Sequence, residues 1–521
     1  MNILYLFQFI MIDVLYRSRQ KENLDKDVLN FLSSLKEDVN ILTYDILGTQ
    51  AHCLMLNKIG ILTPDELSKI LSSLSKIKFE SKNKERLQNI FSDKLFLSED
   101  IHELIETLVI EDIGIDIGGK MHTGRSRNDQ VILDVRMKLR DDIIDICELI
   151  INLIKSLIGK SKEHTHTIIS LYTHLQQAQI GTVSHYLLSY SFNLLRDLER
   201  VSSSFQKINL SPLGSCAIGG TGIPIDRNYT AYLLGFEGLL ENSIDATSSR
   251  DSMIEYLSFL SILMSTLSRI AEDFILWSTS EFNYIELSDR YSSTSSVMPQ
   301  KKNPDPLEII RSRTSIVIGM LISSLSLIKN LPSGYHRDLQ DLKPLLSNSA
   351  TIVKESLLIM KGVIDTFNVN KKNAFNSANK SYGVSLDIAE QIVIKYNISF
   401  RKVHKLIGAL VQHAVKNENI SLSQISKEDV NKILKFTQIK INIDELMSII
   451  KDTTPEKSIL FRNSYGSPNP MQQKDMVNSI EKSLLVYCKV LLERKELLYA
   501  AFDNLEKEVI LNTIVDNEKN Y

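Results

Sequence analysis

The sequence predicts an all-α protein built around a bundle of long helices. The chain has 521 residues but only 20 glycines and 11 prolines, about half the combined share of these helix breakers in an average protein. Between residues 128 and 367, apolar residues recur at helical spacing in long runs. A chain of this length is too large for one compact core, so we expect two or three domains.

The first long helix is expected at 128–160, where apolar residues follow the helical period and the stretch 131–158 contains neither proline nor glycine. At 1.5 Å per residue, such a run forms a helix of about 45 Å. Similar patterns, separated by breaks with glycine, serine or proline, predict four further helices at 176–207, 248–278, 305–330 and 345–367. Five long helices in succession indicate an extended bundle.

The segments on either side of this bundle have shorter periods and more charge. We therefore divide the chain into three parts: an N-terminal helical domain at 1–125, a central long-helix bundle at 126–372 and a C-terminal helical domain at 373–521.

The chain starts with an apolar stretch, MNILYLFQFIMIDVL, that has the hydrophobicity of a targeting segment. It has no basic leading region and no small-residue cleavage site. It is also too short to span a bilayer, and Asp13 interrupts it. We expect no membrane role, and Met11 is an alternative start to Met1.

Charge and cysteine content narrow the partners and the compartment. The 60 basic and 63 acidic side chains give a net charge of −3, which provides no broad positive field for nucleic acid. Cys53, Cys147, Cys216 and Cys488 are far apart and show neither a disulfide framework nor zinc-knuckle spacing. A reducing cytoplasm is the expected location.

Two other patterns point away from cofactors. His164 and His166 are two residues apart and share no helix face, and no third ligand lies nearby in the sequence. The glycine-rich stretch 214–222 lacks the Gly-Lys-Ser/Thr ending of a phosphate-binding loop. We expect neither a metal nor a nucleotide.

The break at 289–308 is a polar, serine-rich loop followed by two lysines and a helix start. Asp305, Pro306 and Glu308 fit an N-cap, a first-turn proline and a capping-box glutamate. Taken alone, the segment predicts a flexible loop before a well-defined helix.

The same break carries the motif Ser-Ser-Val-Met-Pro-Gln-Lys-Lys-Asn-Pro at 295–304, which resembles the signature of the fumarase/aspartase superfamily. Within that superfamily, Gly-Lys-Met-His-Thr-Gly-Arg-Ser-Arg-Asn-Asp-Gln-Val at 119–131 and Tyr-Thr-His-Leu-Gln-Gln-Ala-Gln at 172–179 resemble the argininosuccinate lyase family. Pro-Leu-Gly-Ser-Cys-Ala at 212–217 and Tyr-His-Arg-Asp-Leu-Gln-Asp-Leu-Lys at 335–343 extend this resemblance, which runs from about residue 15 to about residue 480.

The resemblance implies a fumarase/aspartase-like fold and the reversible β-elimination of argininosuccinate to arginine and fumarate, the last step of arginine biosynthesis. Such a reaction needs a base for an unactivated C–H, groups that stabilise the doubly charged aci-carboxylate, and an acid for the departing nitrogen. By similarity, Ser295 on a mobile loop is the base, Lys301 stabilises the dianion and Asn303 holds a carboxylate. The lysine and the amide reach one anion only if the turn at Pro299 folds the segment back.

His174, paired by similarity with Glu308, is the expected general acid or the residue that orients it. A carboxylate partner fixes the tautomer and the orientation of an imidazole. Two alternatives stay open: a lone histidine is often structural, and the capping-box role competes for Glu308.

The resemblance also implies the residues that bind substrate. Arg127, Asn128 and Thr173 match the groups that hold the fumarate-side carboxylates, and clustered cationic and amide groups suit a substrate with several carboxylates. The amino-acid end is assigned to Tyr335, Gln340 and Lys343, and Ser34 also faces substrate. Alternatively, Asn128 is a plain N-cap and Arg127 a solvated charge at a helix end.

Three positions depart from the family pattern. Thr294 and Cys216 stand where glycine is usual, and Ile180 stands where proline is usual. We expect Thr294 to matter most, because a β-branched residue resists the positive φ that glycine permits and stiffens the catalytic loop.

By resemblance, the long helices associate into a homotetramer in which each active site combines the Asn128, His174 and Ser295 regions of three chains. Wide apolar helix faces, which would be exposed on a monomer, agree with this expectation. Two rival hypotheses are another lyase of the superfamily, such as adenylosuccinate lyase or fumarase, and a lyase fold kept as a structural protein.

Overall fold

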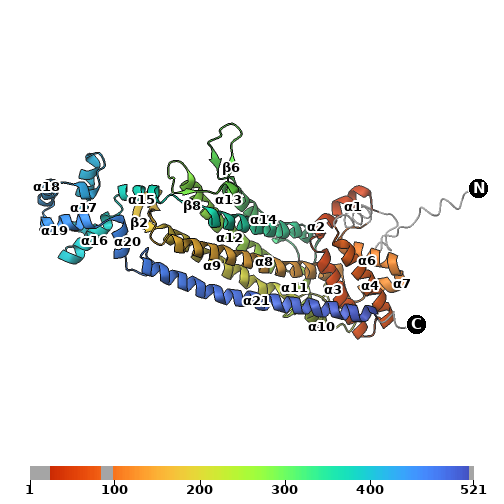
Figure 1. The fold of residues 1–521 in the computed structure, drawn as a ribbon. Helices are drawn as coiled ribbons and strands as arrows, with labels where there is room; N and C mark the ends of the chain where they lie inside the picture. The colour runs from red at the N-terminus through yellow and green to blue at the C-terminus, as the bar shows by residue number, and fades with distance from the viewer. Residues whose placement is uncertain (1–23, 84–97, 515–521) are drawn as a thin grey trace, which may run out of the picture.

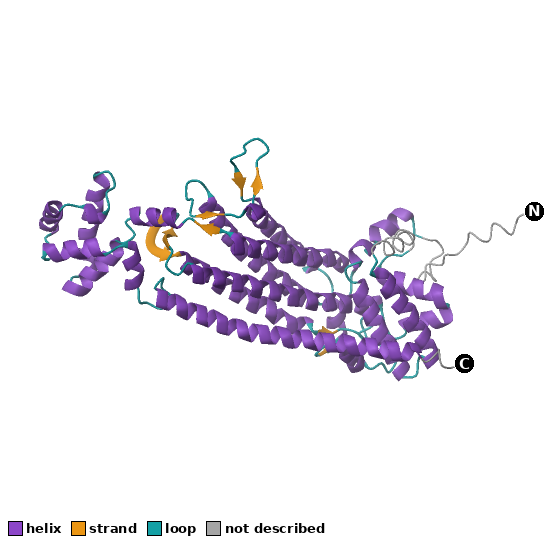
Figure 2. Ribbon diagram, in the orientation of Figure 1, coloured by secondary structure: helices purple, strands orange, loops and turns teal. Residues whose placement is uncertain are grey.

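The computed structural model describes residues 24–83 and 98–514. The two possible starts, Met1 and Met11, lie outside the described residues. Within them the chain forms an elongated, mostly helical molecule in which a bundle of long helices lies between two groups of shorter ones (Figures 1 and 2). The all-α prediction is confirmed.

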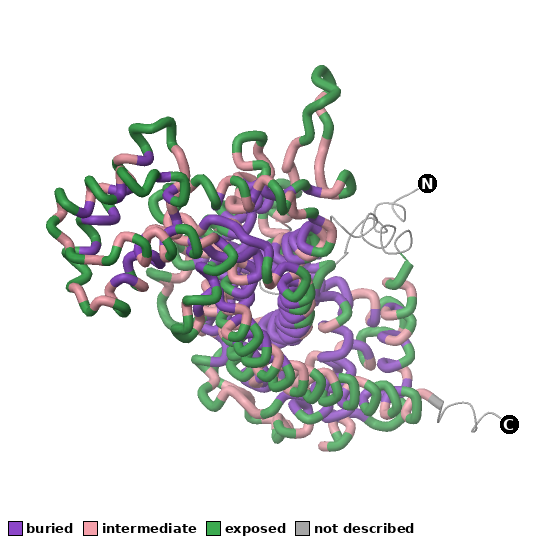
Figure 3. The backbone as a smooth tube through the Cα atoms, turned by 60° about the vertical axis from the view of Figure 1, so that its left-hand side comes forward, coloured by how far each residue is buried: buried purple, intermediate pink, exposed green. Residues whose placement is uncertain are grey.

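Five long helices form the central bundle at nearly the predicted positions. They are α8 (Arg127–Glu163), α9 (Val183–Ile208), α12 (Asp251–Ser278), α13 (Asp305–Ile328) and α14 (Leu342–Thr366). Helix α8 has 37 residues, so it is about 55 Å long. It packs against α9 and α14, while α12 packs against α13 and α9. Figure 3 shows buried backbone concentrated inside this bundle.

One predicted helix begins too early. Residues 176–182 form strand β2 (Gln176–Thr182), which pairs antiparallel with β1 (Ile168–Thr173). Helix α9 begins only at Val183, after Thr182, whose side chain accepts a hydrogen bond from the His185 amide. Gln176 and Gln177 stand about three helical turns before the buried Leu187 and Leu188, so polar residues already interrupt the apolar face there and the predicted start was too early.

The N-terminal group of helices covers one end of the bundle (Figure 1). It comprises α1 (Lys26–Leu32), α2 (Leu35–Asp38), α3 (Leu42–Lys58), α4 (Pro64–Ser81), α6 (Ile101–Ile113) and α7 (Ile115–Gly118). Helix α3 is buried along most of its length and packs against α4 and α8. The N-terminal group therefore shares its core with the bundle.

The C-terminal part divides into two structural groups. Helices α16 (Ser385–Tyr396), α17 (Phe400–Lys416), α18 (Lys427–Thr437) and α19 (Ile443–Asp452) enclose a separate hydrophobic core. In contrast, α21 (Pro470–Ile514) runs back along α9 and α8 to reach α4, and its buried residues belong to the main core. The sequence-based boundaries near 125 and 372 stay predictions.

Short strands connect the long helices. Strand β3 (Leu210–Ser211) pairs with β4 (Gly238–Leu239), and β5 (Ile285–Glu286) pairs with β8 (Asn368–Val369). Strand β6 (Ser293–Thr294) pairs with β7 (Lys302–Asn303) and forms a hairpin that projects from the bundle beside α13 (Figures 1 and 2).

Candidate active site

The projecting hairpin presents the serine loop. Its strands pair antiparallel, with Ser293 opposite Asn303 and Thr294 opposite Lys302. The loop 295–301 therefore carries Ser295 at one end and Lys301 at the other. The fold-back that we expected at Pro299 is present, so a hydroxyl, an ammonium group and an amide are held on one short hairpin.

The Ser295 hydroxyl is held by backbone amides of its own loop. Its Oγ accepts hydrogen bonds from the amides of Val297, at 3.3 Å, and Met298, at 3.0 Å. Amide hydrogens that point at an oxygen favour its negatively charged form. Ser295 is half-buried, whereas Ser296 and Val297 are exposed. The loop thus offers one serine oxygen that is already oriented.

The base of the hairpin is fixed by polar contacts. Ser293 donates a hydrogen bond to Asp305 at the start of α13. The Lys302 ammonium lies 2.7 Å from Asp289 and 3.1 Å from Glu286. Of the two neighbouring lysines, Lys302 therefore braces the hairpin, while Lys301 is exposed on the loop.

The start of α13 differs from the prediction. The N-cap position is Pro304, and no side chain caps the helix. Asp305 is the first helical residue and its carboxylate accepts from Ser293, so the expected capping box of Asp305 and Glu308 is wrong. Glu308 is exposed on the first turn, which leaves its carboxylate free of the competing role. Asn303 is not a helix cap either.

His174 lies in the turn of the β1–β2 hairpin. Thr173 pairs with Gln176, and the two turn residues, His174 and Leu175, have φ of 55° and 56°. Thr173, His174 and Leu175 are all exposed. The turn therefore presents its threonine and imidazole outward, away from the core of its own chain.

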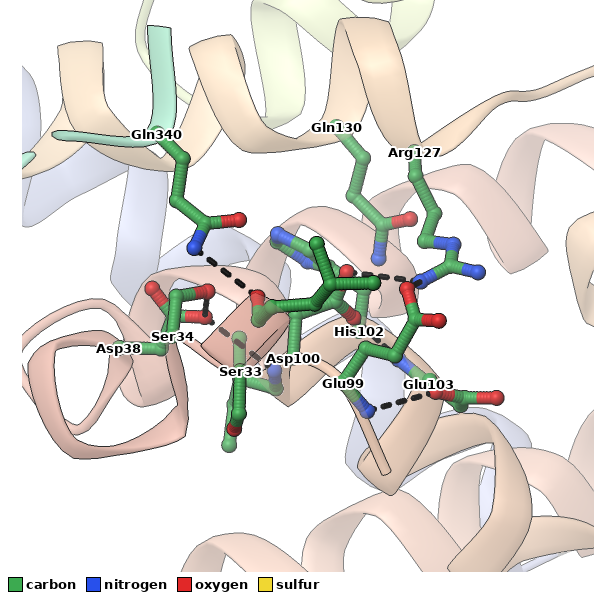
Figure 4. Close-up of polar contacts among 12 residues, drawn as sticks. Ser33, Ser34, Asp38, Glu99, Asp100, His102, Glu103, Arg127, Gln130 and Gln340 are labelled. Atoms are coloured by element: carbon green, nitrogen blue, oxygen red, sulfur yellow. Dashed lines mark hydrogen bonds and ion pairs between the residues drawn. The ribbon is translucent and has the colours of Figure 1, made fainter. Parts of the chain in front are cut away.

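Ser34, Lys343 and Gln340 meet at the opposite end of the bundle. The Ser34 hydroxyl donates to Asp38 at 2.7 Å, and the Lys343 ammonium contacts both Asp38 and the Ser34 oxygen, the latter at 3.1 Å. Gln340 donates to the Leu32 carbonyl at 3.0 Å. Figure 4 shows Ser34, Asp38 and Gln340 in this arrangement.

Asp38 is a buried carboxylate that sequence reasoning missed. It lies four residues after Ser34, so one helical turn brings the two side chains together. This spacing was the only signal in the sequence. Tyr335 lines a small cavity with Gln340, Lys343 and Arg250 beside these groups.

The start of α8 holds Arg127 and Asn128. The N-cap is Ser126, which forms a capping box with Asp129, so the plain N-cap alternative for Asn128 is wrong. The Asn128 amide instead donates to the Ala217 carbonyl at 2.9 Å. Arg127 lies 2.8 Å from Asp100, at the N-cap of α6 (Figure 4), and is therefore not a solvated end charge.

A buried polar network lies beneath Arg127. The His102 Nδ1 is 2.8 Å from Asp45 and 3.5 Å from Asp134. Burial disfavours the charged imidazole, but Asp45 raises the pKa of His102. Among the described residues, Asp45, His102 and Asp134 are the one group with metal-ligand spacing. The Arg125 guanidinium acts on both carboxylates, so its positive charge would oppose a metal ion there.

Asp100 connects this network to Arg127. Although burial opposes ionisation, the charges of His102 and Arg127 lower the pKa of Asp100 to about 2. Asp100 is therefore a carboxylate at neutral pH, and its ion pair fixes the guanidinium at the N-terminal end of α8.

The family-pattern departures have different structural consequences. Thr294 lies in the extended strand β6 opposite Lys302 and needs no positive φ. Ile180 is fully buried in β2. Cys216 has φ of 54°, a conformation that costs a residue with a side chain roughly 1–2 kcal/mol. The strain therefore falls at Cys216 rather than at Thr294, contrary to our expectation.

The predicted site residues form three groups that one chain does not bring together. The Ser295 hairpin projects beside α13, the His174 turn lies at the β2 end of the bundle, and the Ser34 group lies at the α2 end (Figure 1). A single chain therefore presents three partial sites.

Comparison with known proteins gives a consistent picture. A family described as lyase matches residues 18–319, and a domain described as argininosuccinate lyase C-terminal matches residues 384–453. An argininosuccinate lyase of Nitrosopumilus maritimus (strain SCM1) is 45% identical over 95% of this chain and 99% of its own length. One from Methanosarcina mazei (strain ATCC BAA-159 / DSM 3647 / Goe1 / Go1 / JCM 11833 / OCM 88) is 37% identical over 95% and 98% of the two chains.

Solved structures agree on the fold. An EDDS lyase in complex with formate superposes with a TM-score of 0.82 at 28% identity, over 96% of this chain and 97% of that one. A class II fumarase from Schistosoma mansoni gives a TM-score of 0.67 at 16% identity, over 86% and 97% of the two chains. At that identity the second likeness shows the fold alone.

Proposed function

Because this chain belongs to the argininosuccinate lyase family, we propose that it cleaves argininosuccinate to arginine and fumarate by reversible β-elimination. The observation that carries the mechanism is the β6–β7 hairpin. It holds Ser295 and Lys301 at the two ends of one projecting loop, with two amides directed at the serine oxygen.

Ser295 is the base that removes the proton next to the substrate carboxylate. The amides of Val297 and Met298 stabilise the alkoxide that this step requires. Removal of the proton places a second negative charge on the carboxylate, and Lys301 stabilises this aci-carboxylate while Asn303 donates to it. Closure of the loop over substrate excludes water and strengthens these interactions.

His174 protonates the departing nitrogen or orients the group that does so, with Glu308 as its carboxylate partner. The exposed turn can reach another chain, and no helix cap competes for Glu308. Thr173, next to His174, donates to a substrate carboxylate together with Arg127 and Asn128.

The amino-acid end of the substrate binds at the Ser34 group. Lys343, Gln340 and Tyr335 lie around one small cavity, and Lys343 also contacts Ser34. An ammonium, an amide and two hydroxyl groups match the carboxylate and amine of an amino acid. The buried Asp38 contacts both Ser34 and Lys343 and so fixes the positions of their side chains.

We further propose that four copies assemble so that each active site takes its Asn128, His174 and Ser295 regions from three chains. Helix α13 supports this arrangement. Its apolar residues Ile309, Ile316 and Ile322 are about half exposed, and Ile309 lies beside Leu358 of α14 in one hollow; exposed apolar surface of this kind usually marks an interface.

Helix α13 is also the one described helix whose length and composition would allow it to cross a membrane. However, Arg311 is paired with Glu272 and Arg313 with Glu355 on neighbouring helices. Such ion pairs are costly within lipid, so they favour a protein partner. A second copy of this chain is that partner.

We place the enzyme in the cytoplasm. All four cysteines are free thiols, and Cys53 and Cys147 are buried within the core. A protein whose thiols are kept reduced suits that compartment.

The test is direct. Purified protein is mixed with argininosuccinate and fumarate is followed by its ultraviolet absorbance, with adenylosuccinate and malate as control substrates. We expect turnover of argininosuccinate alone. Turnover of a control substrate would favour another lyase of the superfamily, and no turnover of any of the three would favour a structural protein that retains the fold.

A further inference from the structure

The turn that carries His174 is strained. Both His174 and Leu175 have positive φ, although neither is a glycine or an asparagine, and each such residue costs roughly 1–3 kcal/mol. Strain of this kind persists at functional sites only when the surrounding structure fixes the backbone. Because the turn itself is exposed, the fixing contacts must lie below it on the two strands.

Those contacts begin one residue pair further from the turn than Thr173 and Gln176. Tyr172 on β1 pairs with Gln177 on β2. The Tyr172 hydroxyl is hydrogen-bonded to the Tyr284 hydroxyl, which lies 2.7 Å from the Ser377 hydroxyl. The Gln177 amide donates to the same Ser377 oxygen at 2.7 Å. Both strands are therefore tied to one residue of α15 (Lys371–Lys380).

The environment strengthens this chain of hydrogen bonds. Tyr284 is 2% exposed, and the Phe282 ring packs against Tyr172 and Tyr284 with ring centroids 5.7 Å and 5.5 Å away. Burial, and then the neighbouring Tyr284, raise the pKa of Tyr172, so its phenol stays protonated. The Tyr172–Tyr284–Ser377 hydrogen bonds are partly buried, the Gln177–Ser377 bond lies at the surface, and bonds linked in series reinforce one another.

We propose that Tyr172, Gln177, Tyr284 and Ser377 form a clamp that positions the Thr173–His174 turn for catalysis. This inference rests on the proposed function, in which His174 faces substrate. The four are positioning residues that act through the turn. The clamp holds both strands at one level, so the strained turn cannot relax by sliding or splaying the hairpin.

The first test measures the clamp without activity. Tyr284→Phe removes both of its hydroxyl contacts and keeps the ring. Tyr190→Phe is the matched control, because Tyr190 is also buried and its hydroxyl donates to Asp273 at 2.6 Å on a different helix pair. We expect faster amide hydrogen exchange in the peptide 168–182 of Tyr284→Phe than of Tyr190→Phe. Equal exchange in the two variants would overturn the clamp.

The second test measures whether the clamp contributes to catalysis. We expect Tyr284→Phe to lower kcat about tenfold with KM within about twofold, because His174 is misplaced and, of the substrate-binding groups, only Thr173 moves with it, while Arg127, Asn128 and the Ser34 group lie on other elements. In a His174→Ala background the same change should cost less than about twofold, since the group being positioned is gone. An equal fractional loss in both backgrounds would show a merely structural role.

Ser377 provides the conservative rescue. Ser377→Ala should reproduce the loss in kcat and the faster exchange. Ser377→Thr keeps the hydroxyl and should therefore retain most of the native kcat and most of the native protection from exchange. A threonine variant as impaired as the alanine variant would contradict the hydrogen-bond chain. Absence of fumarate formation by the unmodified enzyme would refute the proposed function instead, and hydrogen exchange would still decide the clamp.

Discussion

At the scale of single residues, Ser295 differs from its neighbour in what its oxygen contacts. Ser295 accepts two amide hydrogens from its own loop, whereas Ser296 is exposed. The two serines are adjacent and chemically identical, so the sequence motif alone could not say which oxygen is oriented. Loop geometry supplies the distinction.

Replacing Ser295 with alanine should therefore lower kcat by about 10²–10⁴, with little change in substrate binding, because it removes the base and leaves the carboxylate-binding groups. Steady-state kinetics of fumarate release provide the measurement. Ser296→Ala is the matched control and should be milder. If Ser296→Ala lowers kcat more than Ser295→Ala, then Ser296 and not Ser295 is the base.

Cys216 carries backbone strain that the sequence motif did not reveal. Its φ of 54° is one that glycine adopts freely. Cys216→Gly should raise the free energy of unfolding by about 0.5–1 kcal/mol, because roughly 1–2 kcal/mol of relieved strain exceeds the extra chain entropy of glycine. Thermal unfolding measures the change.

The same substitution inside a helix is the control. Cys488 lies within α21, where glycine has lower helix propensity, and Cys488→Gly should destabilise by roughly 0.5 kcal/mol or more. Opposite signs at the two cysteines would establish the conformational cause. Destabilisation at both would show that Cys216 is not strained in solution.

Sequence motifs predicted individual candidate site residues, but they could not predict a partner that comes from elsewhere in the fold. Ser34 and Lys343 were identified separately, 309 positions apart, and the buried Asp38 between them was missed. Most acidic residues in short helices are solvated, and tertiary contacts with Lys343 and with the Ile101 amide distinguish Asp38 from them.

At the scale of elements, helix starts were the least predictable feature of the site. The periodic interiors of α8 and α13 followed the sequence pattern, but their caps did not. Ser126 caps α8 in place of Asn128, and α13 begins after Pro304 with no side-chain cap. Several polar residues in a row could each serve as an N-cap, and tertiary contacts such as Ser293 with Asp305 decide among them.

The absence of a capping role for Glu308 in this structure sharpens one prediction. His174 and Glu308 should be energetically coupled, so that the double mutant His174→Ala/Glu308→Gln costs clearly less in kcat than the product of the two single losses. A double-mutant cycle on kcat measures the coupling. Multiplicative losses would remove Glu308 as the partner of the imidazole.

The contact between α6 and α8 makes stability depend on pH. The pKa of Asp100 is about 2 in the folded chain, against 3.8 for an ordinary aspartate. A depressed pKa stabilises the fold above the ordinary value, and the stabilisation is lost as pH falls from about 4 to about 2. At 1.36 kcal/mol per unit, it amounts to about 2 kcal/mol.

Asp100→Asn keeps an oxygen that can cap α6 and removes both the charge and the oxygen that accepts from Arg127. The loss in free energy of unfolding, measured in urea, should be full at pH 6. It should be clearly smaller at pH 3, because at that pH the unfolded chain is mostly protonated at Asp100 and the unmodified protein has already lost part of the stabilisation. A difference that grows as pH falls would contradict the stabilisation of the Asp100 carboxylate by His102 and Arg127.

At the scale of the whole molecule, the sequence predicted the five-helix bundle but not the path of α21. Its 45 residues lie in the segment assigned to the C-terminal part, yet the helix returns along the bundle to α4. Amphipathic periodicity shows that a helix has an apolar face and does not say what covers that face. In the same way, the sequence pattern does not say what covers the exposed apolar residues of α13 and α14, for which we propose a second copy of this chain.

The separation of the three site groups along one chain leads to the last prediction. If each active site takes its His174 region and its Ser295 region from different chains, the inactive variants His174→Ala and Ser295→Ala should complement each other when unfolded together and reassembled. A site works only when its histidine chain and its serine chain are each intact. In a random equal mixture with closed symmetric assembly, about a quarter of the sites should therefore recover. Mass spectrometry of the intact assembly verifies mixing, and fumarate release measures recovery. Sites built within one chain would recover nothing, so verified mixed tetramers without activity would refute the shared site while leaving the reaction itself unaffected.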